Sequence, residues 1–411
     1  MRWIAFLFAT ATAPLFSGTV HAQNAPAQVR VTFDSKHITS VYASGLADRT
    51  SGREVKIDDP VRVASVSKLL VALGVMRLVE AGKLDLNRDV SAYLGAIVRN
   101  PNFPDTPVTL EYLLSHTSGL TDDADYIIPL GESVLAKLSD PKAWDNTHSP
   151  GTYFRYTNLN FPVIASVMEA ATGERFDTLM TRLVFKPLRI DACFNWTTCS
   201  DAKIRRAVVL YGADGSVKRD DMQGLRPPCP TVAAADGSCD LTHYAIGSNG
   251  GLFSPQGGLR ISARDLARVG QMLLKNGGRY LKPASLDALI EPRWVYEGDG
   301  VDRGATEHGF FCLYGLGIQI LGSTAAGCND KLFGDGHIRY GHAGDAYGLR
   351  SGLWIDPKAK TGVAFFITAV PDEAPKGRSA FTATEEAALR SPSVPPHNGQ
   401  DTHRARVSQQ P

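Results

Sequence analysis

The chain carries one nucleophile candidate with a base at a suitable distance. Ser65-Val66-Ser67-Lys68 opens the apolar run "SVSKLLVALGVMRLVEAG", which lacks proline and ends at Gly82. This run predicts a buried helix that begins near Ser65, and positions three apart lie on one helix face. A lysine in a desolvated pocket favours its neutral form and can take the serine proton, while the helix N-terminus offers an N–H to an oxyanion. The alternative is that Ser65 only caps the helix and Lys68 lies at the surface, although the apolar surroundings argue against a solvated lysine.

Two further stretches extend this pattern. "LLSHTSGL" covers residues 113–120, and Tyr156-Thr157-Asn158 lies within "PGTYFRYTNLNF". In this order and spacing the three motifs resemble the serine β-lactamase-like superfamily, which includes class C β-lactamases, D-alanyl-D-alanine carboxypeptidases, D-aminopeptidases and β-lactamase-like carboxylesterases. The resemblance covers roughly residues 38–370. Gly-x-Ser-x-Gly is absent from the sequence, so an α/β-hydrolase nucleophile elbow is not supported.

The resemblance implies a site in a cleft between an all-α domain and an α/β domain with an antiparallel sheet. Ser65 would be the acylated nucleophile, Lys68 its partner and Tyr156 a general base or acid. Asn158 would hydrogen-bond the acyl side of the substrate. A tyrosinate beside a lysine cation is a plausible base, because opposite charge favours the ionised phenol. Without the other motifs, Tyr156 and Asn158 would be taken as a pair of turn residues. This chemistry needs no cofactor.

Two tripeptides compete for the third motif of the resemblance. Lys360-Thr361-Gly362 matches the form found in β-lactamases, and His342-Ala343-Gly344 matches the form often found in esterase and peptidase relatives. The segment "DPKAKTG" is rich in turn residues and lies between two apolar strands, so Lys360 is predicted at an exposed hairpin tip. A strand of about seven residues spans roughly 23 Å, which places that tip far from the opposite strand end. We therefore assign the motif to His342 and Gly344, on the strand before the hairpin.

This assignment implies an oxyanion hole and a preference among substrates. The backbone N–H groups of Ser65 and Asp345 would hold the oxyanion. Asp345 departs from the family, which usually has Ser, Thr, Ala or Gly there, and its carboxylate would repel the carboxylate of a penicillin or a C-terminal D-alanine. His342 attracts anions less than a lysine does at neutral pH. Both features count against an efficient β-lactamase, unless Asp345 points away and caps the turn. Three nearby carboxylates could join Asp345 in favouring a cationic or free-amine substrate, or could simply be solvated: Asp122, Asp123 and Asp125.

The elements that must position these residues are readable along the chain. Residues 29–63 and 338–370 alternate like strands, residues 101–190 look mostly helical, and residues 262–278 form a capped amphipathic helix. Strands from both ends of the chain should meet in one sheet. The predicted fold class is α/β of the α+β type, with an antiparallel sheet flanked by helices plus an all-α domain, β-lactamase/transpeptidase-like.

The chain divides into a leader, one hydrolase region and a tail. Residues 1–22 are typical of a secretory signal peptide, with a retained N-terminal anchor as the alternative. Residues 23–390 form the hydrolase, whose α/β part spans about 27–85 and 246–390. Residues 86–245 hold the helical part and a cysteine-rich insertion. Residues 391–411 are polar and proline-rich and are expected to be disordered.

Six cysteines suit an exported protein with disulfides. Pairs of sequence neighbours are the simplest of the 15 possible pairings: Cys193–Cys199, Cys229–Cys239 and Cys312–Cys328. The alternative of free buried thiols is disfavoured outside the cytoplasm. Neither Cys-x-x-Cys nor His-Glu-x-x-His occurs, so no metal site is expected.

The charge balance narrows the possible partners. The chain has 43 Lys and Arg against 42 Asp and Glu, which gives no electrostatic case for nucleic acid or an anionic membrane. The leading hypothesis is a secreted or periplasmic serine hydrolase that acts through a Ser65 acyl-enzyme on an ester or a D-amino-acid peptide or amide. A class C-type β-lactamase or D,D-carboxypeptidase is the runner-up, and a non-catalytic penicillin-binding-like sensor is the alternative of another class. The expected partners are small-molecule or peptide substrates, including cell-wall peptides, and no membrane span remains after signal cleavage.

Overall fold

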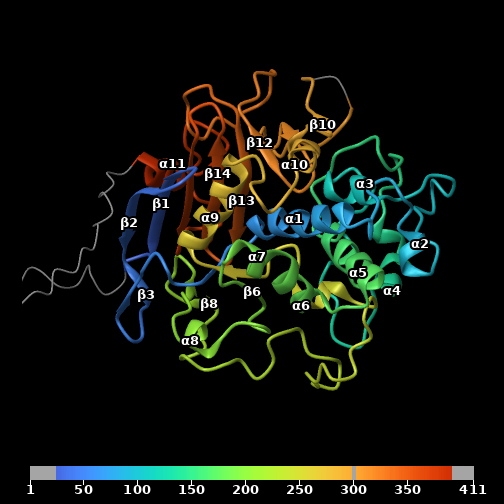
Figure 1. The fold of residues 1–411 in the computed structure, drawn as a ribbon, viewed down its shortest axis with the longest axis horizontal. Helices are drawn as coiled ribbons and strands as arrows, with labels where there is room; N and C mark the ends of the chain where they lie inside the picture. The colour runs from blue at the N-terminus through green and yellow to red at the C-terminus, as the bar shows by residue number, and fades with distance from the viewer. Residues whose placement is uncertain (1–24, 299–301, 391–411) are drawn as a thin grey trace, which may run out of the picture.

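The computed structural model describes residues 25–298 and 302–390 (Figure 1). The expected signal peptide at residues 1–22 and the expected tail at 391–411 lie outside the described residues. Among these residues no helix is both long enough and apolar enough to span a bilayer.

An antiparallel sheet is the framework of the fold, as the sequence predicts, and it has eight strands. Its strand order is β10-β11-β12-β13-β14-β15-β1-β2. The strands are β1 (Gln28–Asp34), β2 (Ile38–Ser44), β10 (Trp294–Val295), β11 (Leu313–Tyr314), β12 (Gln319–Leu321), β13 (Arg339–Ala346), β14 (Leu349–Asp356) and β15 (Thr361–Ile367). Strand β1 pairs with β15 along its whole length, with Val31 opposite Ala364. The two ends of the chain therefore meet in one sheet, which confirms that prediction.

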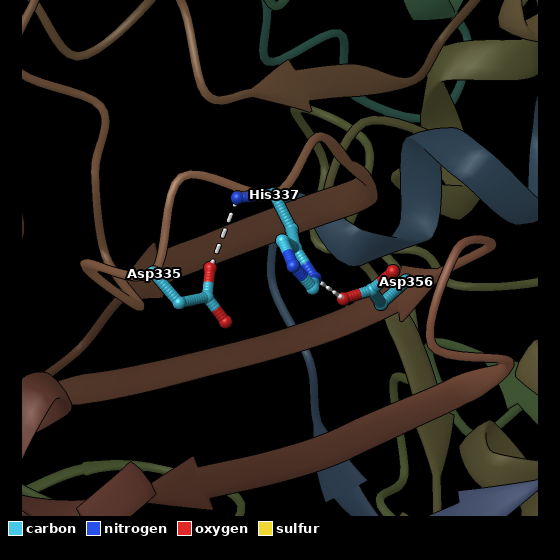
Figure 2. A group of neighbouring side chains, drawn as sticks. All are labelled: Asp335, His337 and Asp356. Carbon is cyan, nitrogen blue, oxygen red and sulfur yellow. Dashed lines mark hydrogen bonds and ion pairs between the residues drawn. The ribbon is translucent and has the colours of Figure 1, made fainter.

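The Lys-Thr-Gly tripeptide lies in a hairpin, also as predicted. Strands β14 and β15 close with Asp356 opposite Thr361, and residues 357–360 between them are exposed. The base of this hairpin carries the polar group drawn in Figure 2, where Asp356 Oδ2 lies 2.7 Å from His337 Nδ1. Arg339 forms ion pairs with both Asp335 and Asp356, so each carboxylate of this group already has a cationic partner.

Helices cover both faces of the sheet. Helix α1 (Val66–Glu80) and helix α9 (Ala263–Leu274) pack on one face, and α11 (Ala383–Arg390) packs on the other (Figure 1). Ser262 caps α9 by accepting a hydrogen bond from the N–H of Asp265. Helix α10 (Pro283–Ile290) also contacts α1.

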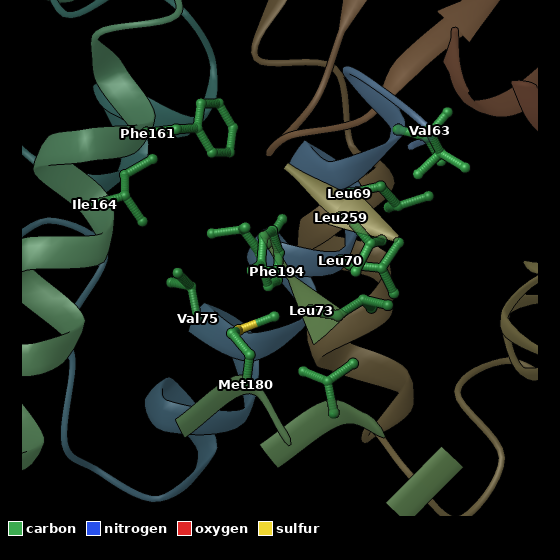
Figure 3. Close-up of a cluster of buried hydrophobic side chains, with 14 of the residues drawn as sticks. Val63, Leu69, Leu70, Leu73, Val75, Phe161, Ile164, Met180, Phe194 and Leu259 are labelled. Carbon is green, nitrogen blue, oxygen red and sulfur yellow. The ribbon is translucent and has the colours of Figure 1, made fainter. Parts of the chain in front are cut away.

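Helix α1 is the buried axis of the molecule. Residues 66–76 are all buried, since the helix lies between the sheet and the helical region. Helix α1 contacts α5 (Asn160–Thr172). Figure 3 shows Leu69 and Leu70 of α1 beside Leu259, in the same buried cluster as Phe161 of α5. Gly82, with φ of 65°, ends the helix as predicted.

The helical region is less helical than the sequence pattern indicates. Its elements are α2 (Ser91–Leu94), α3 (Leu110–Leu114), α4 (Val134–Leu138), η1 (Pro141–Ala143), α5, α6 (Phe176–Met180), η2 (Thr181–Phe185) and α7 (Lys186–Leu188). Only α5 exceeds five residues. The prediction of a mostly helical segment over 101–190 is wrong in extent, because side-chain hydrogen bonds hold long turns where helix was expected. Asp145, for example, accepts bonds from the N–H groups of Thr147 and His148.

The cysteine-rich segment 191–245 is loop-rich, as expected. It contains β6 (Cys193–Phe194), α8 (Asp201–Ile204), β7 (Leu210–Tyr211) and β8 (Val217–Arg219). The predicted pairing of sequence neighbours is confirmed for all three disulfides: Cys193–Cys199, Cys229–Cys239 and Cys312–Cys328. The remaining short elements are β3 (Leu46–Asp48), β4 (Arg53–Glu54), β5 (Val61–Arg62), η3 (Gly250–Phe253) and β9 (Leu259–Ile261). Strand β9 pairs with β5 and β6 in a small sheet that joins the insertion to the segment before α1.

Phe33 joins α9 to the large sheet, and two glycines make room for its ring. A Cβ on Gly270 would lie 2.2 Å from Phe33 Cζ, and one on Gly362 would lie 2.4 Å from it. We predict that Gly270→Ala destabilises the protein by about 1–3 kcal/mol despite the better helix propensity of alanine. Urea denaturation measures the change, and Phe33→Leu in the same chain should restore part of the loss.

Gly74→Ala in α1 is the matched control for that substitution. Its Cβ would meet Met180 Sδ at 2.9 Å, the end of a flexible side chain that can move. Equal stabilities of the Gly270→Ala and Gly74→Ala variants would contradict the role of the Phe33 ring.

Candidate active site

Ser65 lies at a sharp turn between β5 and α1. Ala64, just before it, has a left-handed φ of 45°, a conformation that is uncommon for a residue other than glycine. The hydroxyl of Ser67 holds this turn by donating to the carbonyl of Ala64 at 2.6 Å and accepting from the N–H of Leu259 at 3.1 Å. Ser65 itself makes no side-chain capping bond, so it is not a simple helix cap.

Lys68 is fully buried directly behind Ser65. Its Nζ donates to Ser65 Oγ at 3.0 Å, to Asn158 Oδ1 at 2.9 Å and to the carbonyl of Gln256 at 2.9 Å. Burial lowers the pKa of the Lys68 ammonium to about 7. The lysine is therefore near half-neutral at pH 7, with its nitrogen at hydrogen-bond distance from the candidate nucleophile.

Tyr156 lines the same cavity as Ser65. Lys68 Nζ lies 4.8 Å from the centre of the Tyr156 ring, and Ser65 acts to lower the pKa of the Tyr156 phenol. Burial raises the pKa of Tyr156 above its ordinary value. The protonated phenol is thus the stable form at neutral pH, whereas the sequence left both a general acid and a tyrosinate base open for Tyr156.

Asp122 positions the Tyr-x-Asn motif and does not line the cavity. Its carboxylate accepts from the backbone N–H groups of Asn158 and Leu159, both at 2.9 Å, and from Asn158 Nδ2 at 3.0 Å. Because Nδ2 donates to this carboxylate, Asn158 turns its Oδ1 towards Lys68. The sequence hypothesis that Asp122 meets a cationic substrate therefore loses its basis. The position of Asp122, two residues after "SHTSGL", does not by itself indicate this role in the sequence.

His116 explains the "LLSHTSGL" stretch. This buried residue accepts a hydrogen bond at Nδ1 from the N–H of Thr157 at 3.0 Å. Its ring centre lies 4.4 Å from that of Tyr156. Burial lowers the pKa of His116 well below its usual range, so the ring is a neutral acceptor. The motif positions the Tyr156 loop, a function that the sequence alone did not assign.

The His342 motif borders the same cavity as Ser65, and Lys360 does not. His342 Nδ1 lies 2.6 Å from the carbonyl oxygen of Ala343, so this nitrogen carries the proton, and Nε2 accepts from the Tyr314 hydroxyl at 2.8 Å. Burial and the nearby Lys68 lower the pKa of His342 to about 3. The ring is therefore neutral, and both its nitrogens already have partners inside the protein.

Gly344 allows β13 to approach the turn before Ser65. A Cβ there would lie 2.3 Å from Ser351 Oγ and 2.4 Å from the carbonyl oxygen of Val63. Ser351 Oγ donates to that same carbonyl at 3.0 Å. The close approach at Gly344 and the bond made by its cross-strand partner Ser351 hold the strand that carries Asp345 next to the segment before Ser65.

The Asp345 carboxylate is engaged by a cation. Arg350, its cross-strand partner on β14, donates a hydrogen bond to it, while the Asp345 side chain remains 64% exposed. The ion pair weakens the repulsion that Asp345 was expected to exert on a substrate carboxylate. It also removes Asp345 as support for a cationic substrate.

These residues surround one cavity of about 810 Å³. Ser65, Tyr156, Asn158, His342, Gly344 and Asp345 all line it. The cysteine-rich insertion forms one wall with Trp196, Asp220 and Met222, a position that no pattern in the sequence indicates. Arg62, three residues before Ser65, also lines the cavity and was missed.

The sheet, the central helix α1 and the Ser-x-x-Lys cavity define a β-lactamase/transpeptidase-like protein. Residues 19–388 match the family model described as Beta-lactamase, and the chain belongs to that family.

Several characterised relatives match part of the chain. Esterase EstB of Burkholderia gladioli is 34% identical over 37% of this chain and 42% of its own. Penicillin-binding protein 4 of Amycolatopsis lactamdurans is 33% identical over 36% and 39%, and the D-alanyl-D-alanine-carboxypeptidase/endopeptidase AmpH of Escherichia coli (strain K12) is 28% identical over 44% and 45%. The match thus spans less than half the length of each of these relatives.

Solved structures share the fold. A penicillin-binding protein homologue from Pyrococcus abyssi has a TM-score of 0.62 at 18% identity, covering 85% of this chain and 71% of its own. The D-amino acid amidase from Ochrobactrum anthropi SV3 has a TM-score of 0.61 at 17% identity, covering 88% and 91%. These likenesses support the fold class expected from the sequence.

The hydrogen bonds of Asp122 generate a prediction for stability. Asp122→Ala leaves three N–H donors without their acceptor and should lower the free energy of unfolding by about 1–3 kcal/mol. The exposed neighbour Asp123 is the control, since Asp123→Ala should change stability by no more than about 0.5 kcal/mol. Denaturant titration of both variants gives the comparison, and similar values would show that Asp122 is not an anchor.

Proposed function

We propose that this protein is an exported serine hydrolase that forms an acyl-enzyme on Ser65 from an ester or a D-amino-acid peptide or amide. The observation that carries the proposal is the contact between Ser65 Oγ and a fully buried lysine whose pKa is lowered to about 7. A lysine without a catalytic task is rarely buried in this way.

The geometry supports a stepwise acyl transfer. Neutral Lys68 takes the proton of Ser65 Oγ as that oxygen attacks the carbonyl carbon. The backbone N–H groups of Ser65 and Asp345 stabilise the oxyanion. The Tyr156 phenol gives its proton to the departing oxygen or nitrogen and regains one from the Lys68 ammonium. Water then attacks the carbonyl of the Ser65 ester, with the same groups passing the protons in the reverse order, and the acid is released.

The third motif favours ester and amide substrates over β-lactams. His342 is neutral and internally hydrogen-bonded, so no cation occupies the position where β-lactamases carry their lysine. EstB is described as an esterase, AmpH as a D-alanyl-D-alanine-carboxypeptidase/endopeptidase and a structural neighbour as a D-amino acid amidase. Comparing nitrocefin, a 4-nitrophenyl ester and a D-alanine anilide on one sample ranks these activities, and fastest turnover of nitrocefin would contradict this preference.

Export is supported by the cysteines. All six form disulfides, and such bonds persist in oxidising compartments outside the cytoplasm. The apolar stretch within residues 1–22 adds to this support.

The acyl-enzyme has a direct chemical test. A fluorophosphonate should label wild-type protein on Ser65, which peptide mass spectrometry locates. Ser65→Ala should lose this label and reduce ester hydrolysis by about 10³-fold or more. Ser216→Ala, at an exposed turn between β7 and β8, should behave as wild type. Folded wild-type protein that takes no label would rule out the mechanism, and label without turnover would instead indicate a sensor.

The lowered pKa of Lys68 predicts a pH profile. The base must be neutral, so kcat/KM for a 4-nitrophenyl ester should rise as pH increases through about 7 and level off above it. Below that pKa the rate should fall about tenfold per pH unit, because the protonated fraction of Lys68 grows. Lys68→Arg, which stays charged, should lose activity at every pH. A pH-independent rate between 5 and 9 (about two units either side of 7) would exclude Lys68 as the base.

A further inference from the structure

One buried cation in the catalytic cavity forms no ion pair within the described residues, although the charge of Asp220 acts to raise its pKa. Arg62 is 7% exposed, and its Nε is buried without a hydrogen-bond partner. Within residues 25–298 and 302–390, no hydrogen bond or ion pair to its guanidinium is found, although the guanidinium lies 5.1 Å from the ring centre of Tyr347. A buried charge of this kind is costly unless something pairs with it.

The nearest buried carboxylate is already occupied. Asp220 Oδ1 accepts from Arg260 Nη2 at 2.8 Å and from Trp196 Nε1 at 2.9 Å, while Oδ2 lies 3.3 Å from Arg260 Nε. Arg260 stands opposite Arg62 in the β5–β9 pair, so it adds positive charge beside Arg62. A third guanidinium, that of Arg219, lies 5.1 Å from the same Tyr347 ring. Asp221, the remaining carboxylate on this wall, is exposed.

The Arg62 guanidinium borders the space where a substrate would lie. Its neighbours Tyr347 and Gly257 line the cavity together with Ser65, and a Cβ on Gly257 would lie 3.7 Å from Arg62 Nη2. Arg62 precedes Ser65 by three positions, so their Cα atoms are at most about 11 Å apart. Burial and the adjacent Arg260 lower the pKa of Arg62 to about 10, which leaves it charged at neutral pH.

We propose that Arg62 is a carboxylate-binding residue of the catalytic cavity, and that the preferred substrate carries a carboxylate near its scissile bond. This inference rests on the proposed acyl transfer at Ser65. A planar guanidinium offers paired N–H donors to a carboxylate. A substrate carboxylate would therefore form the ion pair that Arg62 does not form within the protein. The anion is thus recognised on the insertion side of the cavity, away from the neutral His342.

Two matched substrate pairs test the proposal on either side of the ester. Mono-4-nitrophenyl glutarate against 4-nitrophenyl pentanoate places the carboxylate on the acyl portion. 4-Acetoxybenzoate against its methyl ester places the carboxylate on the leaving portion. In wild type the anionic member of one pair should have the higher kcat/KM, by about tenfold to a hundredfold. Arg62→Gln should abolish that preference, and Arg279→Gln, at an exposed site outside the cavity, should keep it.

The proposal would be overturned if both Arg62→Gln and Arg279→Gln lost the preference for the anionic substrate. It would also be overturned if wild type showed no such preference in either substrate pair. A second measurement tests the proposal even if Arg62→Gln folds poorly. Glutarate should slow fluorophosphonate labelling of Ser65 in wild type and Arg279→Gln, and much less in Arg62→Lys, whose compact ammonium cannot form the same paired contact. Normal labelling without protection by glutarate in wild type would refute the Arg62 site alone. Absence of labelling would refute the proposed acyl-enzyme itself.

Discussion

The burial of Lys68 is the constraint on which the rest of the site depends. An amine without water must find acceptors, and its three come from separate parts of the chain: Ser65, Asn158 and the carbonyl of Gln256. Asn158 is in turn held by Asp122, which accepts a hydrogen bond from its Nδ2. The lysine thus fixes the geometry of its surroundings, and the low-dielectric surroundings set the proton affinity of the lysine.

The sequence was sufficient to predict those features of the fold and the site that depend on residues close together along the chain. Ser65 and Lys68 could be paired because a helix places positions three apart on one face, and the hairpin at Lys360 followed from turn residues between two apolar strands. The disulfides could be paired because sequence neighbours are the shortest connections. In each case the relevant distance is set within about 20 residues of chain.

What the sequence missed depends on contacts between distant segments. The roles of Asp122 and His116 follow from which N–H groups lie opposite them, and the acidic or aromatic character of a residue does not reveal that partner. The protonated state of Tyr156 follows from burial, which no local pattern specifies. Arg62 was overlooked for the same reason, since an arginine beside a strand is usually solvated, and only the fold shows that Asp220 belongs to Arg260.

The pairing of β1 with β15 has a consequence for how the protein reaches its native state. Gln28 lies opposite Ile367, so an early strand must wait for nearly the whole chain before its central neighbour exists. Such non-local pairing slows folding, because a long loop must close before the contact is gained. A chain synthesised from its N-terminus therefore cannot complete this sheet until β14 and β15 have been made. That delay leaves the early strands in need of protection from aggregation until their partners are present.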